Sequence, residues 1–367
     1  MKSTLDVFAE NLKNRRKELG LTQQKLAELI GYSEKSISKW ESGIAIAPSV
    51  ILPTLAKHLL TDIDSLLYCP EEPSYYLGID GGGTKTEFLL VSETGEKLAS
   101  VTLGASNPVD VGINKCFELL SNGIETVCGD IPKHKISVYA GMAGGTTGDN
   151  KRKIRSFLSK YRFAKIDNGG DAQNALACAL GNDNGTIVII GTGVIAYTQI
   201  DNKQYKNYGF GYLFEEGGSG FAVGRDAILS SLKDEEGSGD KTILTTLLKT
   251  KLRVNTILEA LPRFYEGGKR EIASYAPIVY EAYLKNDIVA KRILEKNLKI
   301  VADIIKSVPK TIEQPQKIIL IGGQINNAET ILPILQKFLE NPNLYEISLC
   351  KQAPVYGALR LAGLKEL

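Results

Sequence analysis

A run of three glycines separates two strand-like segments near residue 80, in the stretch YYLGIDGGGTKTEFLLV. Glycine lets backbone amide groups approach the oxygens of a phosphate, because it has no side chain to block them. Asp80 stands directly before Gly81–Gly83, and an aspartate at a strand end can hold a Mg²⁺-bound water. The spacing lacks the G-x-x-x-x-G-K-S/T pattern of a Walker loop that opens a helix. The stretch therefore predicts a strand, a phosphate-binding turn and a returning strand.

Two later segments repeat this pattern. Residues 185–205, GTIVIIGTGVIAYTQIDNKQY, again show a strand, a glycine turn and a returning strand, and residues 317–327, KIILIGGQINN, show a strand, Gly-Gly and then a helix from about Ala328. Each turn alone is also compatible with a plain β-turn. Three of them in this order predict a duplicated fold with a nucleotide in its cleft. The residues expected around the nucleotide are Gly81, Gly82, Gly83, Thr84, Lys85, Thr86, Gly191, Thr192, Gly193, Gly322 and Gly323.

The three stretches, together with GFGYLFEEGGSGFAVGRDA and the later GALRLA, resemble the superfamily of actin, hexokinase and the heat-shock-protein ATPases. They are most similar to the N-acetylglucosamine kinase family, whose fold is shared by BadF-BadG-BcrA-BcrD-type ATPases that activate reductases. The resemblance spans roughly residues 75–367. It implies an α/β, duplicated ribonuclease-H-like (actin/hexokinase-type) fold with two lobes, residues 75–180 and 181–367. It also implies ATP and Mg²⁺ as cofactors, with Asp80 holding the metal through water.

The stretch IDNGGDAQNALACALG, residues 166–181, places Asp171 at the entrance of an alanine-rich helix. From the local sequence alone, the commoner role of such an aspartate is a helix cap. The resemblance implies instead that Asp171 is the catalytic base, which accepts the proton of a sugar hydroxyl during phosphoryl transfer. It further implies that Asn107, Asp171 and Glu216 bind the sugar.

Several sugar-binding positions depart from the family pattern. Gly217 stands where the family has a glutamate, and Glu216 replaces the preceding aspartate. Val194 and Ile195 follow the second glycine turn, where the family usually has a polar side chain, and Thr146 replaces another aspartate. A site that relies on paired hydrogen bonds rejects ligands that leave them unpaired. These changes predict an altered sugar preference or slow transfer.

The first 68 residues predict a separate, small all-α domain. In LTQQKLAELIGYSEKSISKWESG, Thr22 and Ser33 are N-caps of two short helices joined by a turn at Gly31, and Trp40 faces inward. This stretch resembles the Cro/C1-type (XRE) helix-turn-helix family, although a helical bundle for docking or oligomerisation is the alternative. The resemblance implies contacts with double-stranded operator DNA by Gln23, Glu34, Lys35, Ser36 and Lys39. One such module binds weakly, so we expect a homodimer, with residues 69–74 as a linker.

Composition sets limits on the partners. The net charge of +2 is too small for bulk affinity to nucleic acid or membranes, so a DNA contact has to come from a local surface. Five cysteines occur without a C-x-x-C pair, which favours a reducing compartment over a metal knuckle. No apolar run reaches the ~20 residues that a bilayer requires. We expect a cytoplasmic protein with no membrane partner.

Two hypotheses remain open from the sequence. The chain is either an ATP-dependent kinase of N-acetylglucosamine or a related hexose that reports to a promoter, or a regulator that binds sugar and nucleotide without turnover. A third, a reductase-activating ATPase, requires cysteines that hold an iron–sulfur cluster, and the scattered cysteines do not suit it. The fused DNA-binding segment favours transcription regulation in both leading hypotheses.

Overall fold

The structure, a computed structural model, describes residues 3–67, 72–310 and 315–365. Its contacts divide the chain into two units, unit 1 with Met1–Asn174 and Pro354–Leu367, and unit 2 with Ala175–Ala353. Within unit 1 we call the helical domain up to residue 67 the reader, and the rest lobe I; unit 2 is lobe II. The predicted second lobe, 181–367, differs from this division because residues 354–365 belong to unit 1. Residues 68–71, which include the first half of the predicted linker, lie outside the described residues.

The reader consists of short helices around one apolar core. Ser3, Thr22 and Ser33 cap its first three helices through their side chains, as the sequence predicts for the last two, and Gly31 ends the second in the left-handed conformation. Trp40 is buried with Phe8 in the core, which confirms its inward position. The helices are α1 Thr4–Glu18, α2 Gln23–Ile30, α3 Glu34–Glu41, η1 Ser49–Ile51, α4 Leu52–His58 and α5 Ile63–Leu67.

Lobe I is built on a five-stranded sheet in the order β3-β2-β1-β4-β5. The first three strands form an antiparallel meander, and β4 and β5 run parallel to β1. The strands are β1 Tyr75–Gly81, β2 Thr86–Ser92, β3 Lys97–Leu103, β4 Ile136–Met142 and β5 Lys165–Gly169. The strand, glycine turn and strand predicted from residue 75 are therefore confirmed.

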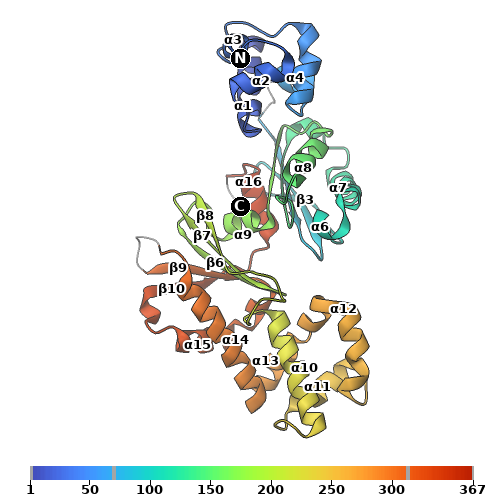
Figure 1. Ribbon diagram of the computed structural model, residues 1–367, viewed down its shortest axis with the longest axis vertical. Coiled ribbons are helices and arrows are strands. Elements are labelled where there is room, and N and C mark those ends of the chain that lie inside the picture. Colours follow the sequence, from blue (N-terminus) through green and yellow to red (C-terminus); the bar gives the residue numbers. More distant parts are fainter. Residues whose placement is uncertain (1–2, 68–71, 311–314, 366–367) are drawn as a thin grey trace. The chain divides into compact units, whose positions relative to one another are not determined.

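Helices cover both faces of this sheet (Figure 1). Leu77 and Ile79 pack in the core that α7 and α8 complete, whereas Tyr76 and Gly78 face α16. A side chain at Gly78 would come within 2.6 Å of the Val355 carbonyl oxygen, so only glycine lets α16 lie this close. The helices are α6 Pro108–Val111, α7 Ile113–Cys128, η2 Lys133–Lys135, α8 Asn150–Ser159 and α16 Pro354–Leu361.

Lobe II repeats the plan of lobe I. Its sheet has the order β10-β9-β6-β7-β8, so β6 to β10 occupy the same relative places as β1 to β5, with the same parallel and antiparallel pairings. The strands are β6 Gly185–Ile190, β7 Val194–Ile200, β8 Lys203–Asn207, β9 Gln316–Ile321 and β10 Tyr345–Leu349. The predicted fold class, a duplicated α/β fold with two lobes after a small helical domain, is confirmed.

Each sheet is completed by the helix that follows the other sheet in the sequence. The second half of α9, which follows β5, packs against Ile187 and Ile319 in lobe II, and α16, which follows β10, packs in lobe I. The remaining helices of lobe II fill its other face around Val188 and Leu320. The helices are α9 Asp171–Ala179, α10 Gly220–Glu236, α11 Ile243–Leu252, η3 Ile257–Ala260, α12 Leu261–Ala273, α13 Ala276–Leu284, α14 Ile288–Ser307, η4 Gly323–Asn327, α15 Ala328–Phe338 and η5 Pro342–Leu344.

Across residues 3–67, 72–310 and 315–365, no helix has both the length and the apolar character needed to cross a membrane. Cys116 and Cys128 are buried free thiols, and Cys69 lies outside the described residues.

Candidate functional site

In lobe I, the loops that follow three parallel strands meet at one edge of the sheet, since parallel strands end on the same side. The turn after β1 is closed by a 2.8 Å hydrogen bond from Gly82 N–H to the Lys85 carbonyl. Ala143, after β4, donates to the Gly81 carbonyl at 2.7 Å. A Cβ on Gly81 would lie 2.6 Å from the Ser106 hydroxyl, so this position requires glycine.

Asn174 joins α9 to this edge. Its Nδ2 donates to Asp80 Oδ1 at 2.7 Å and lies 3.2 Å from the Ile79 carbonyl and 3.1 Å from the Gly141 carbonyl. Burial raises the pKa of the Asp80 carboxyl to about 6 despite the Asn174 hydrogen bond, and the negative charge of Asp171 adds to the rise. The ends of β1 and β4 are thus held against the helix that begins with Asp171.

Asp171 is the first residue of α9, directly after the Gly169–Gly170 turn that ends β5. Its Oδ1 accepts the Ala172 N–H at 3.0 Å, and the side chain remains exposed to solvent. The surrounding protein nevertheless restricts its solvation, and this burial raises the pKa of the Asp171 carboxyl. Thr146 lies close by, about 4.0 Å from where a Cβ on Gly170 would stand. Asp171 therefore combines solvent access with a basicity above that of an ordinary aspartate.

Other predicted residues of lobe I have additional structural roles. Asn107 caps α6, because its Oδ1 accepts the Val109 N–H at 3.0 Å and its Nδ2 donates to Asp110 at 2.8 Å. Thr86 is buried, and its hydroxyl donates to the Gly104 carbonyl at 2.8 Å. Thr84 and Lys85 are exposed on the turn itself. The side chains of Thr84 and Lys85 can therefore contact a ligand, whereas the side chain of Thr86 is buried and hydrogen-bonded within lobe I.

The carboxyl end of β1 is the place where a Mg²⁺ would bind. No three His, Cys, Asp or Glu side chains gather around one point in the part of the chain that the structure describes. Mg²⁺ often binds without such a cage, since it keeps several waters and takes oxygens from the nucleotide phosphates. Asp80 and Asp171 repel each other, and a divalent cation would relieve that repulsion. The two carboxylates therefore fit a water-mediated Mg²⁺.

Lobe II brings its glycine segments together in the same way. The Gly191–Gly193 turn is closed by a 2.9 Å hydrogen bond from Gly191 N–H to the Gly193 carbonyl. Gly220 and Phe221, at the start of α10, donate to the carbonyls of Gly191 at 2.8 Å and Thr192 at 3.1 Å. The first N–H groups of α10 thus hold this turn in place.

The Gly322–Gly323 segment contacts the end of β6, directly before the same turn. Gly322 has φ of 111°, and a Cβ there would come within 2.7 Å of the Ile190 carbonyl oxygen. The neighbouring Gln324 lies beside Gly220, 2.7 Å from the position of a Cβ there, and its buried Oε1 has no hydrogen-bond partner. The predicted grouping of Gly191–Gly193 with Gly322–Gly323 agrees with this geometry, and Gln324 is an addition that the sequence did not indicate.

Glu215 is a further residue that sequence reasoning missed. It is only 7% exposed, whereas its neighbour Glu216 is exposed and uses its backbone N–H to bond the Tyr208 hydroxyl at 3.2 Å. Burial raises the pKa of the Glu215 carboxyl, although it accepts hydrogen bonds from the Ser219 hydroxyl and the Val194 N–H. Glu215 therefore connects the Gly191–Gly193 turn to the start of α10. The only signal in the sequence was the pair of adjacent glutamates, and the sequence did not indicate which of them is buried.

On the reader, α3 presents the predicted base-contacting side chains to solvent. Glu34, Lys35 and Lys39 are exposed, and Ser36 is partly exposed beside the Ser33 hydroxyl at 2.8 Å. Gln23, at the start of α2, donates to Glu41 Oε2 at 2.7 Å. The predicted DNA contacts thus lie on the two helices that a helix-turn-helix uses.

Comparison with known proteins covers both parts of the chain. The model of the BadF/BadG/BcrA/BcrD ATPase family matches residues 77–362, and a helix-turn-helix model matches residues 12–66. An N-acetylmuramic acid/N-acetylglucosamine kinase of Clostridium acetobutylicum is 31% identical over an aligned length of 301 residues, and the alignment covers 78% of this chain and 98% of that protein.

Two solved structures share the fold. A candidate N-acetylglucosamine kinase from Chromobacterium violaceum is 22% identical, with a TM-score of 0.62 over 79% of this chain and 99% of that one. A ROK family transcriptional regulator, a homologue of the E. coli MLC protein, is 12% identical, with a TM-score of 0.53 over 98% of this chain and 96% of that one. The second likeness extends over the reader as well as the lobes.

Proposed function

The chain belongs to the BadF/BadG/BcrA/BcrD ATPase family, and from that premise we propose that it is a DNA-binding transcriptional regulator whose ATPase domain phosphorylates an amino sugar. The observation that carries the proposal is the placement of Asp171, a solvent-accessible carboxylate of raised pKa, at the edge where Asp80 and the Gly81 turn also lie. The named kinase activity of the clostridial relative suggests N-acetylglucosamine and N-acetylmuramic acid as first substrates to test.

In this mechanism, Asp171 accepts the proton of the attacking sugar hydroxyl while that oxygen forms a bond to the γ-phosphorus of ATP and the bond to the β-phosphate oxygen breaks. The products are a sugar phosphate, ADP and a proton. The N–H groups of Gly82 and Gly191 already close their turns, so those of Gly83, Thr84, Thr192 and Gly193 would hold the phosphates, with Gly322–Gly323 beside the purine. Asn107 and Glu216 bind the sugar. Mg²⁺, held through water by Asp80, would neutralise charge on the phosphates.

The reader would convert occupancy of this site into a change of DNA affinity. Gln23 and Ser36 reach phosphates of the operator, and Glu34, Lys35 and Lys39 face base edges. A homodimer would place two readers on two half-sites, which raises both affinity and specificity. A protein that uses promoter DNA and ATP in this way acts in the cytoplasm.

A sensor without turnover is the second candidate. It is favoured by the loss of a carboxylate at Gly217 and by the exposed position of Glu216, because sugar hydroxyls then meet fewer paired acceptors. It keeps ATP and sugar binding but makes no product.

The deciding experiment measures product. The purified full chain is incubated with ATP, Mg²⁺ and a panel containing N-acetylglucosamine, N-acetylmuramic acid, glucosamine and glucose, and sugar phosphate is detected by mass spectrometry. We expect product with an N-acetylated sugar and none above background from Asp171→Ala. If wild type and Asp171→Ala give the same background with every sugar, the kinase proposal is wrong and the sensor remains.

A further inference from the structure

An ion-pair network connects the reader to lobe I within unit 1. One guanidinium nitrogen of Arg155, on α8, lies 2.7 Å from Glu18 Oε2 at the end of α1. The other lies 3.2 Å from Asp167 Oδ1 on β5. Glu18 also pairs with Arg15 at 3.0 Å. Four charged groups of alternating sign therefore run from the interior of the reader to the sheet of lobe I.

The reader end of this network is firmly anchored. Arg15 is 9% exposed, and it donates to the carbonyls of Leu59 at 2.8 Å and Leu60 at 2.7 Å, where α4 ends. Burial and the nearby charge of Arg155 both lower the pKa of Arg15, and Glu18 partly compensates for this. On the same helix, Arg16 pairs with the buried Glu41 at the end of α3. The helix that carries Glu18 is therefore bonded to α3 by a buried ion pair and to the end of α4 by hydrogen bonds.

The lobe I end of the network is anchored beside the candidate catalytic residue. Asp167 lies on β5, the strand that continues through Gly169–Gly170 to Asp171. Its Oδ1 also accepts the Asn168 N–H at 2.8 Å, and the Asn168 amide donates to the Lys151 carbonyl on α8 at 3.0 Å. Arg155 thus contacts the strand that positions Asp171, from the helix that is itself hydrogen-bonded to that strand.

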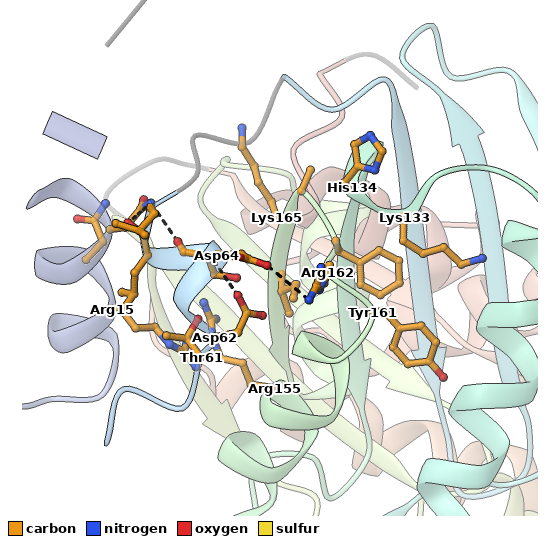
Figure 2. A pocket seen from close by; sticks show the side chains of 18 of the residues that line it. Arg15, Thr61, Asp62, Asp64, Lys133, His134, Arg155, Tyr161, Arg162 and Lys165 are labelled. Carbon is orange, nitrogen blue, oxygen red and sulfur yellow. Dashed lines mark hydrogen bonds and ion pairs between the residues drawn. The ribbon is translucent and has the colours of Figure 1, made fainter. Parts of the chain in front are cut away.

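The surface around these contacts is open. Reader and lobe I border a cavity of about 850 Å³, with Arg15 on the reader side and Lys133, His134 and Arg162 on the side of lobe I (Figure 2). A second ion pair, Arg162 with Asp64 at 3.4 Å, crosses the same space with both side chains 70% exposed. Exposed ion pairs contribute little individually. The contact between the reader and lobe I therefore depends on the network of Arg155, whose side chain is 19% exposed compared with 70% for Arg162.

We propose that Arg155 couples ligand binding at the Asp171 site to the orientation of the DNA reader, by linking Glu18 of the reader to Asp167 of β5. The inference rests on the proposed regulatory function. A ligand that shifts the end of β5 alters the Asp167–Arg155 contact, and Arg155 passes this change to Glu18. Arg155, Glu18 and Asp167 are not among the residues that the proposed function assigns to DNA, nucleotide or sugar.

The experiment measures operator affinity with and without ligand. The DNA probe is a duplex selected by the wild-type full chain from a random-sequence library, and the ligand is AMPPNP with Mg²⁺ and N-acetylglucosamine. For wild type we expect the DNA dissociation constant to change by about tenfold on ligand addition, a typical coupling between two sites. In Arg155→Gln, Glu18→Gln and Asp167→Asn the change should fall below about twofold, while each variant still binds DNA.

Arg152→Gln is the matched control, because Arg152 lies on the same helix and pairs locally with Asp149 at 2.9 Å. It should keep the wild-type response. Thermal unfolding checks that the variants are folded. If Arg155→Gln does not fold, the variants at Glu18 and Asp167 still test the proposal, because these side chains are 43% and 59% exposed. A wild-type response that persists unchanged in all three variants overturns the role of Arg155 alone. No response in wild type overturns the regulatory function and this link together.

Discussion

Asn174 Nδ2 lies 2.7 Å from Asp80 Oδ1, so the helix that begins at Asp171 is hydrogen-bonded to the end of β1. The same amide group lies within hydrogen-bonding distance of two main-chain carbonyls, Ile79 at 3.2 Å and Gly141 at 3.1 Å. Asn174→Ala would remove the donor that Asp80 Oδ1 and the two carbonyls share. We expect it to lower the free energy of unfolding by about 1–3 kcal/mol, measured by urea denaturation. Asn122→Ala, at an exposed position on α7, should change it much less; equal effects of the two would contradict this role.

Gly81 and Gly104 form a matched pair for testing the phosphate-binding turn. A methyl group at Gly81 would meet the Ser106 hydroxyl at 2.6 Å, whereas nothing lies within 4 Å of one at Gly104. We expect Gly81→Ala to destabilise the protein by about 1–3 kcal/mol through overpacking and to weaken ATP binding, and Gly104→Ala to do neither. Calorimetric unfolding and ATP titration measure both effects. If Gly81→Ala binds ATP with normal affinity, this turn does not contact the nucleotide.

The raised pKa of Glu215 predicts that the free energy of unfolding depends on pH. Because burial raises its pKa, the folded protein holds this proton more tightly than the unfolded chain does. The stabilisation is therefore present in acid and is lost as the pH rises through the folded pKa. Glutamine cannot ionise, so the free energy of unfolding of Glu215→Gln relative to wild type should rise between about pH 4 and neutral. A difference that is constant with pH would contradict the prediction.

Glu215→Gln should weaken ATP binding, even though its stability relative to wild type rises with pH. The Ser219 hydroxyl and the Val194 N–H lose their charged acceptor, which loosens the Gly191–Gly193 turn. We expect the dissociation constant for ATP to rise about tenfold, equivalent to about 1.4 kcal/mol. Glu216→Gln is the control, since Glu216 is the exposed neighbour. If both variants bind ATP equally well, Glu215 does not position the turn.

Glu41 predicts the opposite pH dependence within the reader. Burial disfavours its charge, but hydrogen bonds from Arg16 and Gln23 outweigh this and hold the pKa of Glu41 below its usual value. Stability from the ionised group is then present above the unfolded pKa and lost as the pH falls. At neutral pH, Glu41→Gln should cost about 1.5–3 kcal/mol, and the difference from wild type should shrink in acid. Glu28→Gln, which alters an exposed pair with Lys25, serves as the control.

Lys35 and Lys39 test the DNA surface. Both side chains are exposed on α3, so replacing them with alanine should leave the thermal unfolding temperature unchanged. The double variant should bind the selected duplex at least about tenfold more weakly, with a smaller dependence of affinity on salt, because fewer counterions are released. Fluorescence anisotropy at several salt concentrations measures both effects. Lys97→Ala, on an exposed strand of lobe I, should bind like wild type, and an unaffected double variant would remove α3 from the interface.

Local signals in the sequence were sufficient for much of the fold. The caps at Thr22 and Ser33, the inward Trp40 and the strand before Gly81 each depend on residues within a few positions, and all agree with the structure. The repeated order of strand, glycine turn and strand was enough to predict the duplication. These features are predictable because capping, turn geometry and alternation of side chains operate over short distances.

Long-range relationships were not predictable. The placement of α16 on the sheet of lobe I depends on the absence of a side chain at Gly78, far away in sequence. In EEGGSG, which of Glu215 and Glu216 points inward depends on an irregular loop that has no fixed side-chain period. The pairing of Arg155 with Glu18 joins two surface helices whose patterns give no sign of a shared contact.

The assignment of residues 354–367 to unit 1 also sets an order of events during synthesis on the ribosome. The reader's core uses only residues up to Leu67, so it can form early, while the Gly78 face of lobe I stays bare until all of lobe II has been translated and α16 emerges. A nascent chain thus completes its helix-turn-helix domain well before lobe I is finished, and nonsense mutations shortly before Pro354 would leave the first without the second.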